Sequence, residues 1–457
     1  MLETEILARI QFATTISFHY IYPPMTIGLG IIMVIMEGFY YFTKKKQYEI
    51  MTRFWSKVFA LIFALGVATG IVMEFQFGTN WSAYSRFVGD IFGSALAAEG
   101  IFAFFLESGF LAILVFGWNR VKPGFHFFAT IMVALGAHLS ALWIIVANSW
   151  QQTPAGYHIV SNGITQRAEL VDFWQVVFNP STIERVSHTL SGCWLAGGFL
   201  VLSVAAYYLL KNKHLEFAKS SLKIALGMVF FASLFQLFTG HSSAIQVAKT
   251  QPAKLAAFEA HYDSSAAGSM YLWGWVDDEN QKVIGGPAIP GMLSFLTHWD
   301  WDAPITGLNA FPKEDRPPVN AVFQTYHIMV AIGMAMIAIA IVGVFLLIRK
   351  KLFKAKWYLY ILLFSVLLPH IANQLGWASA EIGRQPWIVY GLLRTKDAVS
   401  VTVSYGELLF SLILFVLIYL LLLFLFLFLL NRKIKQGPDS IDSQQPEDLS
   451  QESILEN

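Results

Sequence analysis

The sequence contains a single cysteine, Cys193, so the chain cannot form an internal disulfide, and cysteine usage does not indicate a compartment. Charged residues are also scarce. They make up 13% of the 457 residues, against 56% hydrophobic residues, and the formal net charge is only +1. Because so few charges cannot cover an ordinary soluble domain, we predict a polytopic membrane protein. The near-neutral charge gives no indication of nucleic-acid binding, and we expect none.

The N-terminus lacks the basic segment that opens a secretory signal. It has acidic residues at Glu3 and Glu5 instead, so we expect no cleavable signal peptide. No internal repeat of the kind found in inverted-repeat transporters is visible. The C-terminal end is acidic and rich in Ser and Gln, and we predict a disordered tail over 432–457.

Long apolar runs fill most of the remaining chain. A membrane helix needs about 20 mostly apolar residues to cross a hydrocarbon core of roughly 30 Å. We therefore predict an all-α membrane bundle of about nine transmembrane helices, near 12–42, 55–78, 92–118, 125–150, 187–210, 221–240, 321–348, 357–380 and 404–431. The chain then divides into six spans in 1–240, a long polar loop over 241–320, three spans in 321–431 and the tail.

The basic residues define the orientation of these spans. Lys and Arg concentrate in short loops that alternate along the chain, around residues 44–57, 120–122, 211–223, 349–356 and 432–435. Since such loops remain in the cytoplasm, we predict an outside N-terminus, a cytoplasmic C-terminus and an external 241–320 loop.

Two carboxylates lie within the third predicted span, Glu99 and Glu107. Eight residues apart on a straight α-helix, they share a broad face and are separated by roughly 12 Å along the axis. Two carboxylates inside one membrane helix are hard to explain by packing, whereas buried glutamates can hold and pass on protons. We predict a proton relay, with a cation site as the alternative.

A third carboxylate, Glu381, ends the eighth span and is followed by Arg384. A glutamate at the end of a membrane helix is costly unless its charge is offset. Arg384, three residues on and on the same helix face, is one candidate partner, and a bound cation is the other.

Histidine and methionine supply the remaining intramembrane candidates, His19, His188 and Met329. A single membrane histidine is more often a hydrogen-bonded helix contact than a ligand, and methionine is usually core filler. Histidine with methionine is nevertheless a recognised axial pair for haem iron. We interpret His138 and Asn148 as structural.

The predicted orientation brings five of these residues to a similar depth. His19, Glu99, His188, Met329 and Glu381 all fall in the outer half of their spans, beneath the long external loop. Unrelated structural polar residues would not be expected to converge in this way. The pattern therefore predicts a cofactor site.

The residues that carry this pattern also form recognisable motifs. They are residues 8–12 with His19, 74–81 with 84–87, Glu99 with 104–108, His188-Thr189, Met329, and 383–387. With these motifs the chain resembles subunit I of the cytochrome bd-type quinol oxidases over essentially its whole membrane portion.

The resemblance implies three haems and a reaction that oxidises quinol and reduces dioxygen to water. It implies that His188 and Met329 ligate a low-spin haem b. It also implies that His19 and Glu381 each ligate one of two high-spin haems, one b and one d, without deciding which. The short external loop leaves open a third haem b in place of haem d.

The resemblance assigns roles to the other candidates as well. Glu99 matches the acid beside the oxygen-reducing haem, and Glu107 lies on the inward proton route. Trp377 matches an aromatic next to the high-spin pair. Arg384 matches a partner of a haem propionate, and Arg9 is counted with the cofactor-binding residues.

The external loop carries the residues expected at the quinol. Lys254 and Glu259 match loop residues implicated in quinol oxidation. Quinol would release its protons outside, while oxygen reduction would take protons from the cytoplasm past Glu107 toward Glu99. Charge separation would then follow from the placement of the sites, without pumping. The chemistry belongs to the haems, and the protein supplies ligands and proton delivery.

The resemblance also implies partners and a location. It implies a second integral membrane subunit, leaves room for a small single-span accessory subunit, and places the complex in the bacterial cytoplasmic membrane. One departure concerns His327, which stands where many relatives have an arginine. It is an alternative to Met329 as a ligand.

Two other functions remain open at the level of sequence. The first is a proton-coupled cation transporter that uses Glu99, Glu107 and Glu381. Such a transporter would have no need of His188 and Met329 at matched depth. The second is a non-catalytic membrane carrier of haem b, which would need only one or two ligand pairs and no acid beside an open iron.

Overall fold

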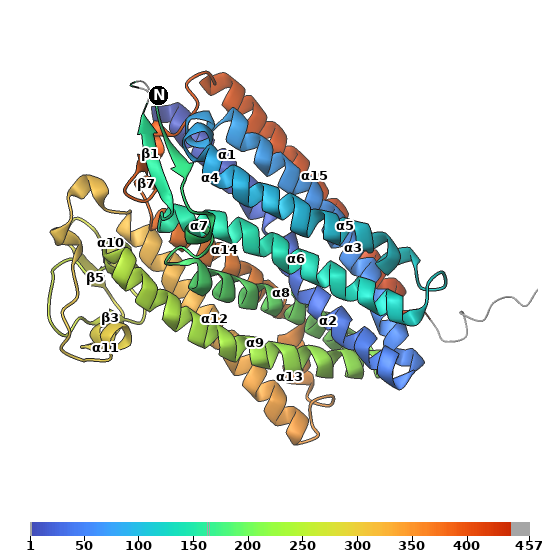
Figure 1. Cartoon of the computed structure of the whole chain (residues 1–457). Helices are drawn as coiled ribbons and strands as arrows, with labels where there is room; N and C mark the ends of the chain where they lie inside the picture. The colour runs from blue at the N-terminus through green and yellow to red at the C-terminus, as the bar shows by residue number, and fades with distance from the viewer. Residues whose placement is uncertain (1, 162, 164, 440–457) are drawn as a thin grey trace, which may run out of the picture.

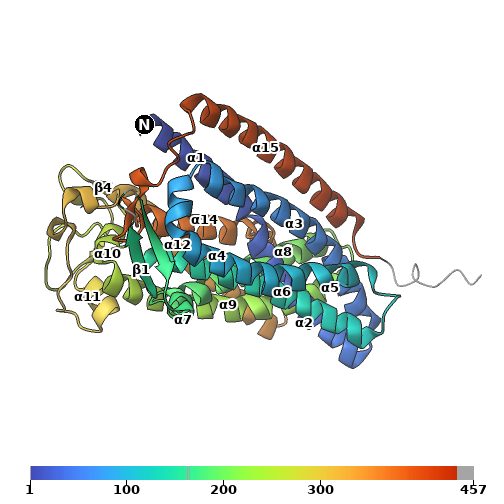
Figure 2. The same ribbon diagram turned by 45° about the horizontal axis from the view of Figure 1, so that its top comes forward.

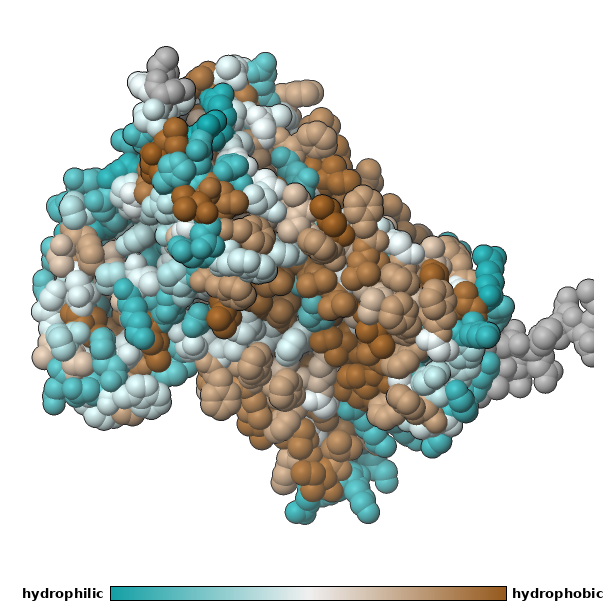
Figure 3. Space-filling view, viewed as in Figure 1, coloured by the Kyte–Doolittle hydropathy of each residue, from teal (hydrophilic) through white to brown (hydrophobic). Residues whose placement is uncertain are grey.

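The protein, described by a computed structural model over residues 2–161, 163 and 165–439, is a bundle of long helices (Figure 1). Within these residues nine helical segments are long and apolar enough to span a membrane, which confirms the predicted all-α membrane fold. The space-filling view shows a hydrophobic belt between two hydrophilic ends, as expected for a protein that crosses a bilayer (Figure 3).

The nine segments are built from the following helices. The first six spans comprise α1 (Leu2–His19), α2 (Tyr22–Thr43), α3 (Lys46–Thr79), α4 (Ser82–Glu99), the π-helical turn η1 (Gly100–Phe104), α5 (Phe105–Phe116), α6 (Pro123–Gln152), α8 (Thr182–Leu210) and α9 (Leu215–Thr250). The last three comprise α12 (Val319–Ile348), α13 (Lys356–Phe364), α14 (Leu367–Ile382) and α15 (Tyr405–Gln436).

The centre of the bundle is α8, which contacts α2, α6, α9, α13 and α14. Its closest neighbour is α2, because both helices lack side chains at the crossing. A Cβ added to Gly28 would lie 2.4 Å from the Cys193 carbonyl oxygen, and one added to Gly197 would lie 2.3 Å from the Leu29 nitrogen. Small residues therefore bring these two backbones together. In contrast, α15 lies along the outside of the bundle (Figure 2).

Three predicted spans differ from continuous α-helices. The first is divided between α1 and α2, because Pro23 and Pro24 lack the amide hydrogens that a helix interior needs and instead start α2. The third contains the turn η1 between Glu99 and Glu107, so the straight-helix geometry expected for this pair is wrong. The eighth changes from α13 to α14 at residues 365–366.

Two predicted boundaries also shift. Helix α9 continues to Thr250, about ten residues beyond the predicted end of its span, since residues 241–250 have no proline to interrupt the helix. Helix α15 continues to Gln436, so residues 432–436 are helical. The rest of the predicted disordered tail falls mainly on residues 440–457, outside the described residues.

The segments outside the bundle form small elements at one end of it. They are the hairpin of β1 (Tyr157–Ser161) and β2 (Gln166–Leu170), α7 (Phe173–Val177), α10 (Pro252–Phe258), β3 (Met270–Tyr271), β4 (Trp275–Asp277), β5 (Lys282–Ile284), β6 (Ala288–Ile289), α11 (Met292–His298), η2 (Leu308–Ala310), η3 (Lys313–Asp315), β7 (Trp387–Val389), β8 (Leu393–Arg394) and η4 (Thr395–Asp397). The strands pair antiparallel as β1–β2, β3–β6, β4–β5 and β7–β8.

The two ends of the bundle carry different parts of the chain. The N-terminal end of α1 and the loop over 251–318 lie at one end, and the C-terminal end of α15 lies at the other (Figure 1). At that second end the Tyr208 hydroxyl donates a hydrogen bond to the Ile434 carbonyl at 2.6 Å. The relative arrangement agrees with the predicted alternation. Which end faces the cytoplasm stays a prediction.

Candidate functional site

One large cavity, of about 1380 Å³, lies within the bundle and extends to the base of the 251–318 loop. Single ligand pockets usually measure about 300–1,000 Å³, so this space exceeds the needs of one small molecule. Every candidate residue named from the sequence lines it: Arg9, His19, Glu99, Glu107, His188, Lys254, Glu259, Met329, Trp377, Glu381 and Arg384. The structure thus brings together residues from six membrane helices and the loop.

The two histidines are held in the same way on different helices. His19 is the last residue of α1, and its Nδ1 lies 2.9 Å from the Thr69 hydroxyl on α3. His188 is in the second turn of α8, and its Nδ1 lies 3.1 Å from the Thr239 hydroxyl on α9. A histidine that ligates a metal normally donates its other ring N–H to such a partner. Both rings have the arrangement expected of ligands.

Met329 faces the cavity from α12, whereas His327 is turned to the loop. A Cβ added to Gly376 of α14 would lie 2.7 Å from the Met329 sulfur, so this glycine makes room for it. The His327 ring nitrogens lie 2.9 Å from the Phe323 carbonyl and 2.8 Å from the Tyr271 carbonyl. The His327 ring therefore lies between two backbone carbonyls, and a neutral imidazole can donate to one of them.

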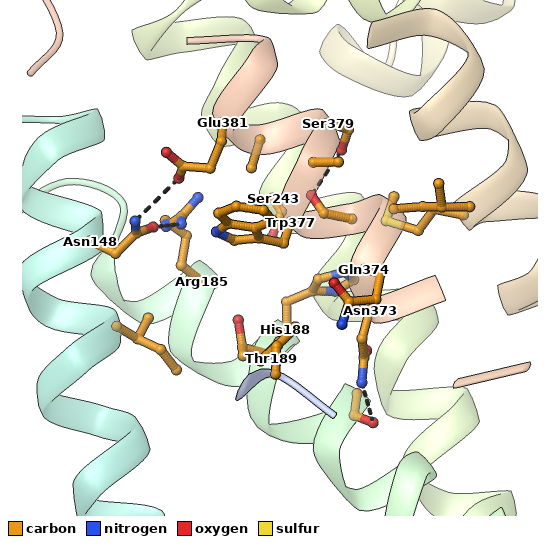
Figure 4. Close-up of a pocket in the computed structure, with 18 of the residues that line it drawn as sticks. Asn148, Arg185, His188, Thr189, Ser243, Asn373, Gln374, Trp377, Ser379 and Glu381 are labelled. Atoms are coloured by element: carbon orange, nitrogen blue, oxygen red, sulfur yellow. Dashed lines mark hydrogen bonds between the residues drawn. The ribbon is translucent and has the colours of Figure 1, made fainter. Parts of the chain in front are cut away.

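Glu381 lies at the end of α14, among groups that donate hydrogen bonds or carry positive charge. Arg384 forms an ion pair with it, and Asn148 and Gln152 donate side-chain amides to its Oε1 at 3.1 and 3.3 Å. Figure 4 shows Glu381 turned toward Asn148 and Arg185, with the Trp377 ring beside them. Of the two candidates considered to balance the charge of Glu381, Arg384 is the one that contacts it in the structure.

Positive charge exceeds negative charge around Glu381. Arg185 donates a hydrogen bond to the Ser149 hydroxyl at 3.2 Å and a second, short one to Asn148. Lys254 is buried, and its Nζ donates to the Gln152 carbonyl oxygen Oε1 at 2.5 Å. The guanidinium groups of Arg384 and Arg185 therefore lie near one carboxylate, and Lys254 adds a further charge when it is protonated. Buried charges need counter-charges, so this end of the cavity is suited to an anionic ligand.

These features fit haem better than a bare metal ion. Haem carries carboxylates that need cationic partners, and Nη1 of Arg384 is buried with no hydrogen-bond partner among residues 2–439 that are described. Each haem iron takes only one or two protein ligands, and His19, His188, Met329 and Glu381 come from four different helices. In the described part of the chain, no three His, Cys, Asp or Glu side chains group as ligands of a bare ion.

Glu99 and Glu107 line the inner part of the cavity against α6. Glu99 accepts a hydrogen bond from the Ser140 hydroxyl at 2.6 Å. Glu107 is buried, and a Cβ added to Gly136 would lie 2.8 Å from its Cβ, so this glycine lets α5 approach α6. Both carboxylates face the same helix, α6, along the length of the cavity. The proton relay predicted for this pair stays a prediction.

Lys254 and Glu259 are buried at the base of the loop, at the two ends of α10. Burial, with Arg384 and Arg185 nearby, lowers the pKa of Lys254 well below its usual value. Burial raises the pKa of Glu259 to about 8. The Oε2 atom of Glu259 has no hydrogen-bond partner within the described residues and lies 3.9 Å from Nε2 of His327. The site therefore holds a carboxyl that exchanges protons near neutral pH.

Sequence reasoning missed part of this network. Asn148 was interpreted as structural, but it connects Glu381 with Arg185. Gln152 connects Lys254 with Glu381. The available signal was the run of amides at the end of the fourth span, residues 148–152, which is more polar than a helix end in lipid requires. His138 agrees with its structural interpretation, since Trp194 donates its indole N–H to it at 3.0 Å.

Arg9 lies at the rim of the cavity. Its side chain is exposed and forms an ion pair with Glu5 at 3.4 Å. Arg9 lines the cavity, as the other candidate residues do. Its side chain forms no hydrogen bond or ion pair with any of the four candidate ligands.

Comparisons with known proteins identify the family of the chain. A family model for cytochrome bd terminal oxidase subunit I matches residues 7–438. Cytochrome bd ubiquinol oxidase subunit 1 of Bacillus subtilis (strain 168) is 40% identical over 442 residues, which is 94% of each chain. Cytochrome bd-II ubiquinol oxidase subunit 1 of Escherichia coli (strain K12) is 35% identical over 508 residues, covering 96% of this chain and 98% of that one.

A solved structure gives the same result for the fold. The bd oxidase from Geobacillus thermodenitrificans matches with a TM-score of 0.89 and 29% identity, over 95% of this chain and 99% of that chain. Both the sequence and the fold match over nearly the full length. The chain therefore belongs to the cytochrome bd terminal oxidase subunit I family.

Proposed function

We propose that this quinol oxidase subunit oxidises quinol near the outer membrane face and reduces dioxygen to water with protons from the cytoplasm. The observation that carries the proposal is the single cavity shared by all the candidate residues, from Lys254 and Glu259 at the loop to Glu99 and Glu107 deep in the bundle. A quinol oxidase needs both sites and a connection between them, and this cavity joins them.

The residues of the cavity would hold two haems b and one haem d, or a third haem b in place of haem d. His188 and Met329 would ligate the low-spin haem, and His19 and Glu381 would each ligate one of the two high-spin haems. When bound, the haems supply the electron transfer and the oxygen chemistry. Trp377, between these ligands, would exclude water from the high-spin pair.

The cationic groups at the outer end would bind the haem propionates. Nη1 of Arg384 has no hydrogen-bond partner within the described chain, Arg185 contributes further positive charge, and Lys254 does so when protonated. Guanidinium groups pair with carboxylates through short, charge-assisted hydrogen bonds. On a propionate, Arg384 would divide its N–H groups between the haem and Glu381. Arg9, at the rim, would add charge at the entrance.

At the loop, Lys254 and Glu259 would bind quinol and receive its protons. A carboxylate with a pKa of about 8 is a matched acceptor for a proton released near neutral pH. The acceptor atom would be Oε2 of Glu259, which has no hydrogen-bond partner among the described residues and lies 3.9 Å from Nε2 of His327. The hydrogen bonds from Lys254 through Gln152 to Glu381 connect this site with the high-spin ligand.

Protons for oxygen reduction would enter from the opposite end of the bundle. Glu107 would receive them in the interior and pass them to Glu99, which the Ser140 hydroxyl orients. Because quinol releases protons outside and oxygen reduction consumes them from inside, the reaction would move charge across the membrane without a pump.

The relatives are named as subunit 1 of their oxidases, which implies a subunit II partner for this chain. A small single-span accessory subunit would complete the complex, as in the resemblance described above. We place the complex in the bacterial cytoplasmic membrane, with the N-terminus and the 251–318 loop outside.

A reduced-minus-oxidised optical spectrum of the purified complex, with oxygen uptake measured on added quinol, tests the proposal. We expect bands of low-spin and high-spin haem together with oxygen uptake, and pigment extraction will identify haem b and haem d. Absence of all haem bands would contradict the oxidase function and favour a cation transporter. A single low-spin b spectrum without oxygen uptake would indicate an electron carrier.

A further inference from the structure

The two candidate histidine ligands share a feature that the family assignment does not explain. Each ring packs on a Thr-Gly dipeptide of a neighbouring helix, which we call a Thr-Gly seat. His19 packs on Thr69-Gly70 of α3, and His188 packs on Thr239-Gly240 of α9. The two seats lie on different helices, in parts of the chain without an internal repeat, so their common geometry calls for a common cause.

The threonine of the first seat determines which ring nitrogen carries hydrogen. The hydroxyl of Thr69 donates its only hydrogen to the backbone carbonyls of Leu65 and Gly66, at 2.8 and 3.1 Å. When it does so, its oxygen accepts the hydrogen bond from His19 Nδ1, at 2.9 Å. This arrangement favours the tautomer with hydrogen on Nδ1, which leaves the lone pair on Nε2 for a metal.

The second seat gives the same result by an independent contact. The hydroxyl of Thr239 donates to the Gln236 carbonyl at 3.3 Å and accepts from His188 Nδ1 at 3.1 Å. The Gln236 side-chain amide lies 3.2 Å from His188 Nδ1 and 3.1 Å from Nε2, so this contact does not distinguish the two ring nitrogens. The threonine carries the assignment: when its hydroxyl donates to the Gln236 carbonyl, the hydrogen of His188 lies on Nδ1 and the lone pair on Nε2, as in His19.

The glycine of each seat lets the ring lie against the helix backbone. A Cβ added to Gly70 would lie 3.2 Å from Cε1 of His19, and one added to Gly240 would lie 3.3 Å from Cε1 of His188. The same ring carbon is nearest in both seats, at nearly the same distance. Both threonine hydroxyls are also buried, so water does not compete for Nδ1.

We propose that Thr69-Gly70 and Thr239-Gly240 are matched positioning pairs that set the tautomer and orientation of the two histidine ligands. This inference rests on the proposed function, because it requires that both histidines ligate haem iron. A hydroxyl that accepts from Nδ1–H makes the imidazole more basic. A more basic ligand stabilises the ferric haem, so each threonine lowers the reduction potential of the haem held by its own histidine.

The test compares Thr69→Val and Thr239→Val with Thr69→Ser and Thr239→Ser in the purified complex. Valine has nearly the shape of threonine without the hydroxyl, and serine keeps the hydroxyl. Spectroelectrochemical titration measures the potential of each haem, and resonance Raman measures the iron–histidine stretch. We expect Thr69→Val to raise the potential of one high-spin haem only. Thr239→Val should raise that of the low-spin haem only, and both serine variants should resemble the parent.

The outcomes separate this inference from the proposed function. Loss of one haem from a valine variant but not from its serine counterpart also supports the seats. Unchanged haem potentials and iron–histidine stretching frequencies in both valine variants overturn the proposed role of the seats. Equal effects of serine and valine also overturn it, because they would indicate packing alone. If the parent complex contains no haem, the proposed function itself fails, and the variants are not needed to show it.

Discussion

At the scale of single residues, Met329 allows a direct test of the ligand assignment, because its proposed role depends on one sulfur atom that leucine lacks. We expect Met329→Leu to remove the sixth ligand of the low-spin haem, so that its spectrum becomes high-spin and quinol-driven oxygen uptake falls. Loss of an outer-shell partner alone costs about 10–100-fold in activity, and loss of a ligand should cost at least as much. The optical spectrum and the uptake rate measure the two effects.

A matched control for this variant is Met33→Leu. Met33 is fully buried on α2 and does not line the cavity, so it reports the cost of replacing a core methionine with leucine. We expect a parental spectrum from the control. A parental spectrum from Met329→Leu as well would contradict the ligand assignment and point to His327 as the ligand.

Glu259 predicts a pH dependence at the quinol site. Its pKa is raised to about 8 by burial, so the carboxyl is mostly protonated at pH 7 and must lose its proton before it can accept one from quinol. With quinol limiting, the rate of oxidation should rise by up to about tenfold per pH unit below 8 and level off above it. Steady-state rates from pH 6 to pH 9 measure this profile.

Two variants test whether that rise belongs to Glu259. Glu259→Gln removes the titrating group and should abolish the rise as well as lower the rate. Glu279→Gln changes an exposed carboxylate of the same loop and should leave the profile unchanged. A rise that persists in Glu259→Gln would assign the pH dependence to another group.

At the scale of helices and loops, the sequence predicts the existence of the spans but not their internal irregularities. Apolar length identifies a span because lipid requires about 20 apolar residues, whatever the local geometry. The π-helical turn η1 and the continuation of α9 to Thr250 depend on contacts between helices, which no span shows by itself. Pro23 and Pro24 indicate the break before α2, whereas apolar length alone predicts one continuous span there.

The turn η1 has a testable consequence for the proton route. A π-helical turn already contains one residue more than an α-turn, so inserting one further residue would rotate Glu107 by about 100° relative to Glu99. We expect insertion of one alanine after Phe102, an exposed residue of this turn, to move Glu107 away from Gly136. Oxygen uptake should fall strongly, while quinol should still reduce the low-spin haem in stopped-flow measurements.

The control for the insertion is Phe102→Ala, which keeps the length of the turn and removes only an exposed side chain. It should retain most of the oxygen uptake. If the insertion variant contained its haems and turned over like the parent, the relative orientation of Glu99 and Glu107 would not matter for proton delivery.

At the scale of the whole molecule, the convergence of the candidate ligands was predictable, whereas the hydrogen-bond network around them was not. Chain direction and depth along each span predicted that His19, His188 and Glu381 lie close together, and all three line the same cavity. The partners of those residues come from helices that sequence places far away. Asn148 is 233 residues from Glu381, and Thr69 is 50 residues from His19. Such contacts require the packed bundle.

Orientation is the property on which the proposed charge separation depends. If the 251–318 loop faces outward, quinol protons are released outside and the reaction generates a membrane potential. If the loop faces inward, the same chemistry generates no membrane potential or a potential of opposite sign. A cysteine at exposed Glu279 of the loop and another at exposed Lys354 between α12 and α13 report the two ends separately. The single native cysteine, Cys193, is buried, so its background labelling should be low.

We expect a membrane-impermeant maleimide to label Glu279→Cys in intact cells and Lys354→Cys only after the membrane is opened. The expectation follows from the basic short loops, which the positive-inside rule places in the cytoplasm together with Lys354. Cys193→Ser serves as the background for both variants. Labelling of Lys354→Cys in intact cells, with Glu279→Cys protected, would invert the orientation. Protons for oxygen reduction would then have to come from outside, and the route from Glu107 to Glu99 would lose its role in charge separation.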